Sequence, residues 1–540
     1  MTLEYYVPTW DSLQRHVLPG WLVDAKFGVY FHWGIYTVPA KGQNVTWYPH
    51  NMYRPGTPQY RYHVETYGDP SKFGYKDFIP QFTAANFDPD AWARLIKEAG
   101  AKFAGPVAEH HDGFSMWASK INPWNAGAMG PKRDIVGEME RAIRAQGMKF
   151  FVAFHHAENY WFYPHWRNEY DTADPACAGL YGPPHDQARD PGNDWERHEP
   201  PSAAFWDQWK AKIFEVIDAY HPDVIWFDFG LRYVPDPYKR EMLAYYYNDA
   251  LDRGMDVAVM YKNDDLPPNI GLLDFELGRS ADLVPFRWIT DSTVDNQGAW
   301  GYSKEAGYKP PRQLIHAMID QVSKNGAMLL NFGPQLDGEI PQGAQDVLRS
   351  IGAWLAINGE AIHGSTPWLI AGEGPIKTPR SGAFSESREV VYTRLDFRFV
   401  MKDHAIYVFL LGWPGEQVLI KTLVKSLQSN GASIKPRSPR SIMAAIKELN
   451  SAGPPLVWRG KTKRRPYTWK AALDMDRYLR RNGDIRRHYF LPPSEIAKIE
   501  MLGVDAPLEW SMTPDGLLVH LPTAAPCQEA STLKISLMHE

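Results

Sequence analysis

The sequence is poor in cysteine, has no long apolar run and carries no strong excess of either charge. Cys177 and Cys527 are the only cysteines among 540 residues, so a disulfide framework is excluded and stability must come from buried side chains. No stretch reaches about 18 consecutive apolar residues, which excludes a membrane-spanning helix. A formal net charge of −5 argues against nucleic acid or an anionic membrane as the main partner.

The N-terminal segment also lacks a basic stretch followed by an apolar run. It is therefore not a signal peptide as written, and a cytoplasmic location is expected. A leader removed earlier would instead place the protein in the periplasm or outside the cell. The sequence leaves the oligomeric state open, with a homo-oligomer among the options.

The composition that remains is that of a globular protein. Hydrophobic residues make up 44% and charged residues 22% of the chain, which excludes global disorder. At roughly 100 to 200 residues per domain, the length predicts about two to four domains. Aromatic residues are abundant at 14%, with 21 tryptophans, which suits large cores and stacking on sugar faces alike.

Between residues 20 and 360, apolar strands alternate with amphipathic helices. The strands are near-continuous apolar runs, as expected when both faces of a parallel sheet are covered. In the helix predicted over 88–100, Asp88 is the N-cap and Trp92, Leu95 and Ile96 share one face. The repeat predicts a (β/α) barrel with insertions, with a doubly wound open sheet as the alternative. The other helices are predicted at 134–147, 202–219, 236–253, 312–325 and 341–357, and strands at 27–32, 102–108, 148–154, 223–228, 256–261 and 327–331.

Nearly every predicted strand ends in a polar or charged residue. Active sites of barrel enzymes lie at the C-terminal ends of the strands. One polar strand end is explained by a turn or a helix cap, but a series rich in histidine and carboxylate predicts a catalytic or ligand-binding rim. The series is His32, Glu109, His110, His111, Asp112, His155, His156, Asp228, Asn263, Glu276 and Asn331.

After residue 365 the pattern changes to short β-rich runs separated by Gly, Pro and Asp. This pattern predicts an antiparallel β-sandwich, with domains at 1–364 and 365–540. Residues 424–495 interrupt the second domain and hold 16 Lys and Arg against 5 Asp and Glu. We favour a solvated, mobile insertion; the alternative is a basic patch for an acidic polysaccharide, a partner subunit or nucleic acid.

Two carboxylates are candidates for glycosidic chemistry. Asp228 follows the apolar run VIWF, and Trp226 shares its strand face. The carboxylate therefore suits a nucleophile or an electrostatic stabiliser, although capping is its simpler role. Glu276 matters because glycoside hydrolysis needs one ionised and one protonated carboxyl, and Trp288 and Trp300 are candidates to raise its pKa by apolar surroundings.

The histidines allow two functional interpretations. Histidines on several strands of a barrel can hold a hydrolytic metal, or they can bind vicinal hydroxyls as neutral imidazoles. Metal-dependent barrel hydrolases often carry His-x-His at the first strand, whereas this chain has Phe31-His32-Trp33. The metal hypothesis is therefore weaker, and at least one of His155 and His156 is expected to be structural.

The motifs FHWG, HHDGF, PKRD and LLNFGP, in this order, resemble those of α-L-fucosidases of glycoside hydrolase family 29. The resemblance runs from about Trp21 to Pro367 and resumes in the C-terminal strands. It implies a barrel followed by a β-sandwich, and removal of terminal α-L-fucose from glycans or fucosides with retention of configuration. It also implies no cofactor and no metal. The implied catalytic residues are Asp228 as nucleophile and Glu276 as acid/base, and the implied substrate-binding residues are His32, Trp47, His110, His111, His155, Trp226 and Trp300.

Two positions depart from the family pattern. Thr46 stands where a carboxylate precedes the motif tryptophan, and Asp265 stands where many members have Arg, with Arg279 as a candidate substitute. These departures bear on the preference for fucose and on linkage. Two alternatives stay open: a metal-dependent barrel hydrolase and a non-catalytic carbohydrate-binding protein. Should Glu276 fail as the acid/base, Glu109, Glu158 and Asp265 are the next candidates.

Overall fold

The computed structural model describes residues 4–185, 201–263, 265–284, 286–305, 307–378, 381–386, 390–423, 491 and 493–538. The predicted fold class is confirmed: eight parallel strands close into a barrel in sequence order, and antiparallel sheets follow. Most of the basic insertion predicted at 424–495, namely residues 424–490 and 492, lies outside the described residues.

The barrel closes by parallel pairing of its first and last strands, with Gly28 opposite Leu329. The strands are short and almost wholly buried, because helices cover the outer face and side chains fill the interior. Their bounds are β1 (Phe27–Phe31), β2 (Phe103–Glu109), β3 (Lys149–Phe154), β4 (Val224–Phe227), β5 (Ala258–Lys262), β6 (Leu272–Asp274), β7 (Trp288–Thr293) and β8 (Met328–Phe332).

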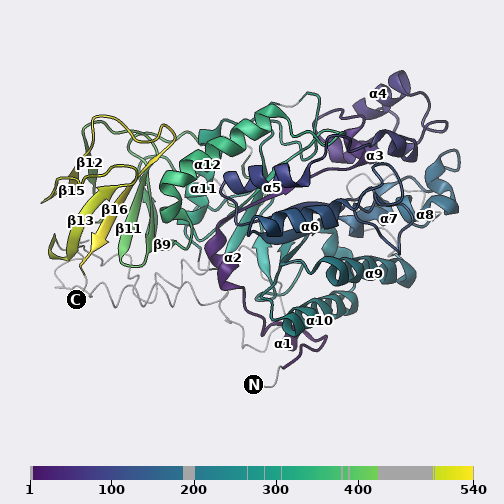
Figure 1. Ribbon diagram of the computed structural model, residues 1–540, viewed down its shortest axis with the longest axis horizontal. Coiled ribbons are helices and arrows are strands. Elements are labelled where there is room, and N and C mark those ends of the chain that lie inside the picture. Colours follow the sequence, from purple (N-terminus) through teal and green to yellow (C-terminus); the bar gives the residue numbers. More distant parts are fainter. Residues whose placement is uncertain are drawn as a thin grey trace.

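The helices lie around the barrel (Figure 1). All six helices predicted between residues 88 and 357 are present, and Asp88 caps one of them by accepting the Ala91 N–H at 2.9 Å. Several segments between a barrel strand and the longer helix that follows it form short helices. The bounds are α1 (Trp10–Leu13), α2 (Gly20–Ala25), α3 (Tyr48–Asn51), α4 (Pro58–Thr66), α5 (Pro89–Glu98), α6 (Ile135–Ala145), α7 (Asn159–Phe162), α8 (Ala178–Tyr181), α9 (Ala203–Tyr220), α10 (Asp236–Arg253), α11 (Pro311–Ser323) and α12 (Gln342–Ile362).

The C-terminal domain is a sandwich of two antiparallel sheets beside α11 and α12 (Figure 1). One sheet has the order β13-β16-β11-β10-β9, the other β12-β15-β14, and side chains of both form one apolar core. A buried ion pair between Asp320 of α11 and Arg398 of β10, at 2.6 Å, joins the sandwich to the barrel. The strands are β9 (Thr366–Glu373), β10 (Phe397–Lys402), β11 (Ala405–Leu410), β12 (Gln417–Ile420), β13 (Ile496–Met501), β14 (Trp510–Thr513), β15 (Gly516–His520) and β16 (Ser531–Leu537).

No helix within the described ranges combines the length and apolar character that a bilayer crossing requires.

Candidate active site

Strand alternation brings polar residues from most of the strands to the C-terminal rim. Interior positions of the strands carry a buried apolar cluster that includes Trp226, Met260 and Ile289. Since side chains two residues apart share a face, the next interior residue on each strand lies at the rim. These rim residues are His32 after Tyr30, His155 after Ala153, Asp228 after Trp226, Lys262 after Met260, Asp274 after Leu272, Asp291 after Ile289 and Asn331 after Leu329.

A β-bulge changes this alternation on β2. The pairing of β2 with β3 shifts register between Val107 and Glu109. Glu109 consequently accepts hydrogen bonds from Lys212 of α9 and from Ser115, both at 2.6 Å. Glu109 is thus part of a structural ion pair on the outer side of the barrel and does not belong to the rim predicted for it.

The bulge leaves the following pair, His110 and His111, at the site. The His110 ring lies 4.4 Å from that of His155, and His111 Nε2 lies 3.4 Å from Asp228 Oδ2. His156, in contrast, contacts the Trp209 carbonyl of α9 at 3.2 Å and is the structural member of its pair, as expected for one of the two.

Asp228 is a carboxylate held among cationic and hydrogen-bonding groups. Its Oδ2 accepts from His155 Nδ1 at 3.1 Å, and its Oδ1 lies 4.0 Å from Lys262 Nζ. Burial alone would raise the pKa of Asp228, but His155, His111 and Lys262 together hold it well below its usual value. Asp228 is therefore ionised at neutral pH, with 13% of its side chain exposed.

Glu276 lies two residues beyond β6, and its Oε2 lies 2.9 Å from Lys262 Nζ. Burial raises the pKa of Glu276 to about 8, and the negative charges of Asp291 and Asp228 add to this effect against the lowering effect of Lys262. Glu276 is therefore mainly protonated at neutral pH. The two candidate carboxyls thus carry opposite protonation states in one site.

Lys262 is one of three rim residues that sequence reasoning missed, together with Asp274 and Asp291. Its Nζ contacts Glu276 and also donates to Asp291 at 3.1 Å, and its pKa is raised above the usual value despite burial. With Asp228 and Asp274 nearby, one cation faces four carboxyls, so the carboxyls cannot all be ionised. Alternation from Met260 to Lys262 was the available sequence signal.

Two further buried groups complete this charged cluster. Tyr30 donates its hydroxyl to Asp291 at 3.0 Å, and Trp226 donates its indole N–H to Asp274 at 2.5 Å. Burial raises the pKa of both aspartates. Trp226 is only 1% exposed, so it forms the floor of the site more than a wall.

The other side of the rim is built of neutral imidazoles. His32 donates from Nδ1 to Asn331 Oδ1 at 2.8 Å. Burial lowers the pKa of His32, His110 and His155, in the last case to about 4. Among the described residues, His110 Nδ1 and His155 Nε2 are buried and have no hydrogen-bond partner. Neutral imidazoles with unsatisfied nitrogens suit the binding of hydroxyl groups.

Two trios at the rim have the spacing of a metal site: His32, His110 and His155, and His111, His155 and Asp228, with ligand atoms within 4.8 Å of one another. In the second trio, His111 Nδ1 donates to the His155 carbonyl at 2.9 Å and its Nε2 faces the Asp228 carboxylate. Glu158 and Asp228 raise the pKa of His111 despite its burial. Both ring nitrogens of His111 thus face acceptor oxygens, an arrangement that favours N–H at both nitrogens over a lone pair for a metal.

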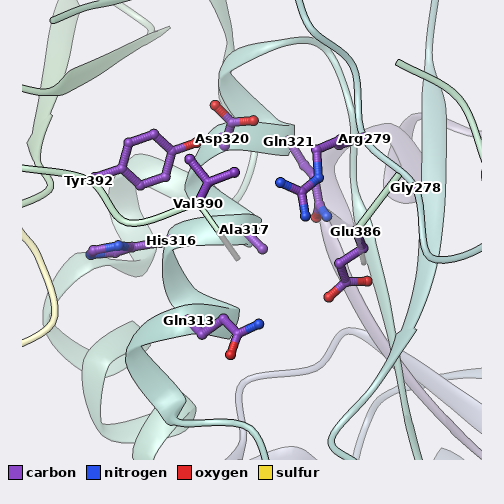
Figure 2. Close-up of a pocket in the computed structure, with 10 residues that line it drawn as sticks. All are labelled: Gly278, Arg279, Gln313, His316, Ala317, Asp320, Gln321, Glu386, Val390 and Tyr392. Atoms are coloured by element: carbon purple, nitrogen blue, oxygen red, sulfur yellow. The ribbon is translucent and has the colours of Figure 1, made fainter. Parts of the chain in front are cut away.

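Two tryptophans at the rim are partly exposed. Trp300 lies 5.5 Å from the His32 ring, and Trp47 lies 5.5 Å from the His111 ring. The structure therefore brings together all nine residues predicted for the site. Arg279, the candidate substitute, lies elsewhere: with Glu386 it lines one side of a cavity beside α11 that faces Tyr392 (Figure 2).

Known proteins share both parts of this architecture. A family model for α-L-fucosidases matches residues 2–360, and a model for the α-L-fucosidase C-terminal domain matches residues 386–536. The tissue α-L-fucosidase of Rattus norvegicus is 32% identical over 427 residues, which make up 77% of this chain and 81% of that protein. That of Bos taurus is 33% identical over 427 residues, 77% of this chain and 79% of that protein.

The crystal structure of the Thermotoga maritima α-fucosidase in complex with fucose has the same fold, with a TM-score of 0.68 and 24% identity over 98% of this chain and 100% of that one. The chain belongs to the α-L-fucosidase family.

Proposed function

We propose that Asp228 is the nucleophile and Glu276 the acid/base of this α-L-fucosidase, a glycoside hydrolase that removes terminal α-L-fucosyl residues with retention of configuration. The opposite pKa shifts of two carboxyls that share Lys262 carry the proposal. A retaining glycosidase needs one carboxylate that attacks and one carboxylic acid that donates a proton.

The spacing of the two carboxyls is compatible with retention. Both contact Lys262 Nζ, so Asp228 Oδ1 and Glu276 Oε2 lie within about 7 Å of each other, which admits the separation of about 5 to 5.5 Å typical of retaining enzymes.

The reaction then has two steps. In the first, an Asp228 oxygen attacks the anomeric carbon, the glycosidic C–O bond breaks, and Glu276 transfers its proton to the departing oxygen. In the second, ionised Glu276 takes a proton from water, the water oxygen attacks the anomeric carbon from the opposite face, and the bond to Asp228 breaks. Each step inverts the anomeric centre, so the product keeps the α configuration, and Glu276 regains its proton.

The imidazole side of the rim is proposed to hold the sugar. His110 and His155 offer buried, unpaired ring nitrogens to fucose hydroxyls, His32 lies buried beside them, and His111 orients Asp228. The partly exposed rings of Trp47 and Trp300 offer apolar surface to the sugar's methyl group. A fucosylated glycan or glycoside is therefore the substrate.

Azide rescue separates the two proposed roles. Asp228→Gly should abolish formation of the glycosyl-enzyme for every leaving group, and azide should replace the nucleophile and give the β-fucosyl azide by one inversion. Glu276→Ala should keep the first step on an activated aryl fucoside, and azide should intercept the glycosyl-enzyme and give the α-fucosyl azide. The same anomer from both variants, or near wild-type turnover of poor leaving groups by Glu276→Ala, would defeat the assignment.

A further inference from the structure

A segment from beyond the barrel is bonded to the backbone of the acid/base loop. Phe384 N–H donates to the Glu276 carbonyl, and Glu386 N–H donates to the Leu277 carbonyl, both at 2.7 Å. Gly382 forms a bridge with Arg279. Residues 381–386, which precede the sandwich strand β10, are therefore fixed to the loop that carries Glu276.

An ion pair anchors this segment. Glu386 accepts from Lys309 Nζ at 2.9 Å and from Ser292 Oγ at 2.9 Å, and Ser292 directly follows Asp291 on β7. Figure 2 shows Glu386 and Arg279 beside each other at the cavity that this segment forms with α11. The segment therefore has a defined position next to the catalytic cluster.

Phe384 lies on this anchored segment with an unfavourable backbone conformation and an exposed side chain. Its φ is +55°, in the left-handed region that a bulky residue rarely adopts, and 55% of the residue is exposed. The ring stacks on that of Phe229, with centroids 6.0 Å apart and planes 19° apart. Phe229 is partly exposed, directly follows Asp228, and its ring centroid lies 5.0 Å from Lys262 Nζ.

We propose that Phe384 and Phe229 form the binding site for the sugar ring of the leaving group. This proposal rests on the function proposed above. A general acid must face the departing oxygen, so the leaving group has to lie on the Glu276 side of the site. The aromatic pair lies at that side, because the Phe384 backbone is hydrogen-bonded to Glu276 and Phe229 directly follows Asp228. An aromatic face suits the apolar C–H face of a pyranose ring.

The test compares two donors that differ only in the leaving group. α-L-Fucosyl fluoride has no sugar ring to leave, whereas an α-L-fucosyl-galactoside disaccharide does. Phe384→Ala should lower kcat/KM for the disaccharide by about 3- to 10-fold and leave the fluoride within about twofold. Leu395→Ala is the matched control, because Leu395 is 58% exposed just before β10 and should affect neither donor.

Two further measurements distinguish the loss of stacking on Phe384 from a displacement of Glu276 as the cause of reduced disaccharide hydrolysis. Fluoride turnover still needs Glu276 as base in the second step, so an unchanged kcat on fluoride shows that Glu276 is intact. Phe384→Tyr should restore disaccharide hydrolysis, and added methyl β-D-galactoside should be fucosylated less by Phe384→Ala than by wild type. Equal losses on both donors, or no loss on the disaccharide, would overturn this site; a wild-type enzyme inactive on both donors would overturn the proposed function instead.

Discussion

The barrel rim has two unlike halves that meet at Asp228. Strands β1, β3 and β8 supply His32, His155 and Asn331, a neutral hydrogen-bonding half that His110 joins. Strands β5 to β7 supply one lysine and two aspartates, a charged half that Glu276 joins. The neutral half is suited to sugar hydroxyls, which need donors and acceptors, while the charged half sets which carboxyl holds the proton. Binding and protonation are thus assigned to separate strands.

Removing the residue shared by the two halves should have the largest effect. Asp228→Asn keeps the shape of the side chain but cannot form the glycosyl-enzyme. We expect kcat/KM to fall by about 10⁴-fold or more on every leaving group, fluoride included. Steady-state kinetics on the fluoride and an aryl fucoside would measure this, and a residual rate within about tenfold of wild type would contradict it.

Glu276→Gln breaks the charged half alone. With a poor leaving group, kcat/KM should fall by about 10²- to 10⁴-fold, because proton donation is lost. In the wild-type enzyme, activity on the same substrate should decline as pH rises through about 8, since Glu276 then loses its proton. In Glu276→Gln this alkaline decline should disappear; its persistence would assign it to another group.

Lys262→Met tests whether the charged half sets the protonation states. Lys262 lowers the pKa of both Glu276 and Asp228, so its removal should raise both values. The alkaline limb of the kcat/KM profile should move to higher pH, and the acidic limb should move to higher pH as well. Lys262→Arg keeps the charge and is the matched control, and unmoved limbs in Lys262→Met would show that Lys262 has no such effect.

His110→Phe breaks the neutral half. Loss of one buried hydrogen-bonding ring should weaken binding of the sugar by about 1 to 3 kcal/mol, or about 5- to 150-fold in kcat/KM. Because the pKa of His110 is already lowered and the imidazole is neutral, the limbs of the pH profile should stay in place. A shifted limb would mean that the halves are not separate.

The smallest effect is expected from Glu109, which lies outside both halves. Glu109→Gln keeps one acceptor oxygen, for Lys212, and places an amide NH2 toward Ser115, so kcat/KM should stay within about twofold of wild type while stability falls by about 1 to 3 kcal/mol. A large loss of activity in a folded variant would show that Glu109 acts in the active site and would contradict its structural role.

The same comparison explains what the sequence could predict. The histidines stood out because HH pairs after apolar strands are conspicuous, and Asp228 followed from alternation with Trp226. Asp274 and Asp291 were missed because β6 has only three residues and β7 was not recognised as a strand. Lys262 was also missed, although its alternation with Met260 was available as a signal. The outward turn of Glu109 depends on a bulge, a register shift between paired strands that no single strand's sequence reveals. Location and oligomeric state stay predictions.

Trapping the intermediate tests the central claim most directly. A 2-deoxy-2-fluoro-α-L-fucosyl fluoride slows both steps of the reaction. Because fluoride is a good leaving group, the glycosyl-enzyme still forms faster than it is hydrolysed, so it should accumulate. Mass spectrometry of the digested protein should then place one fluorofucosyl group on Asp228, and Asp228→Asn should remain unlabelled. Labelling of another carboxylate, or fluoride release from the wild-type enzyme with no covalent adduct, would contradict the assignment of Asp228 as the nucleophile.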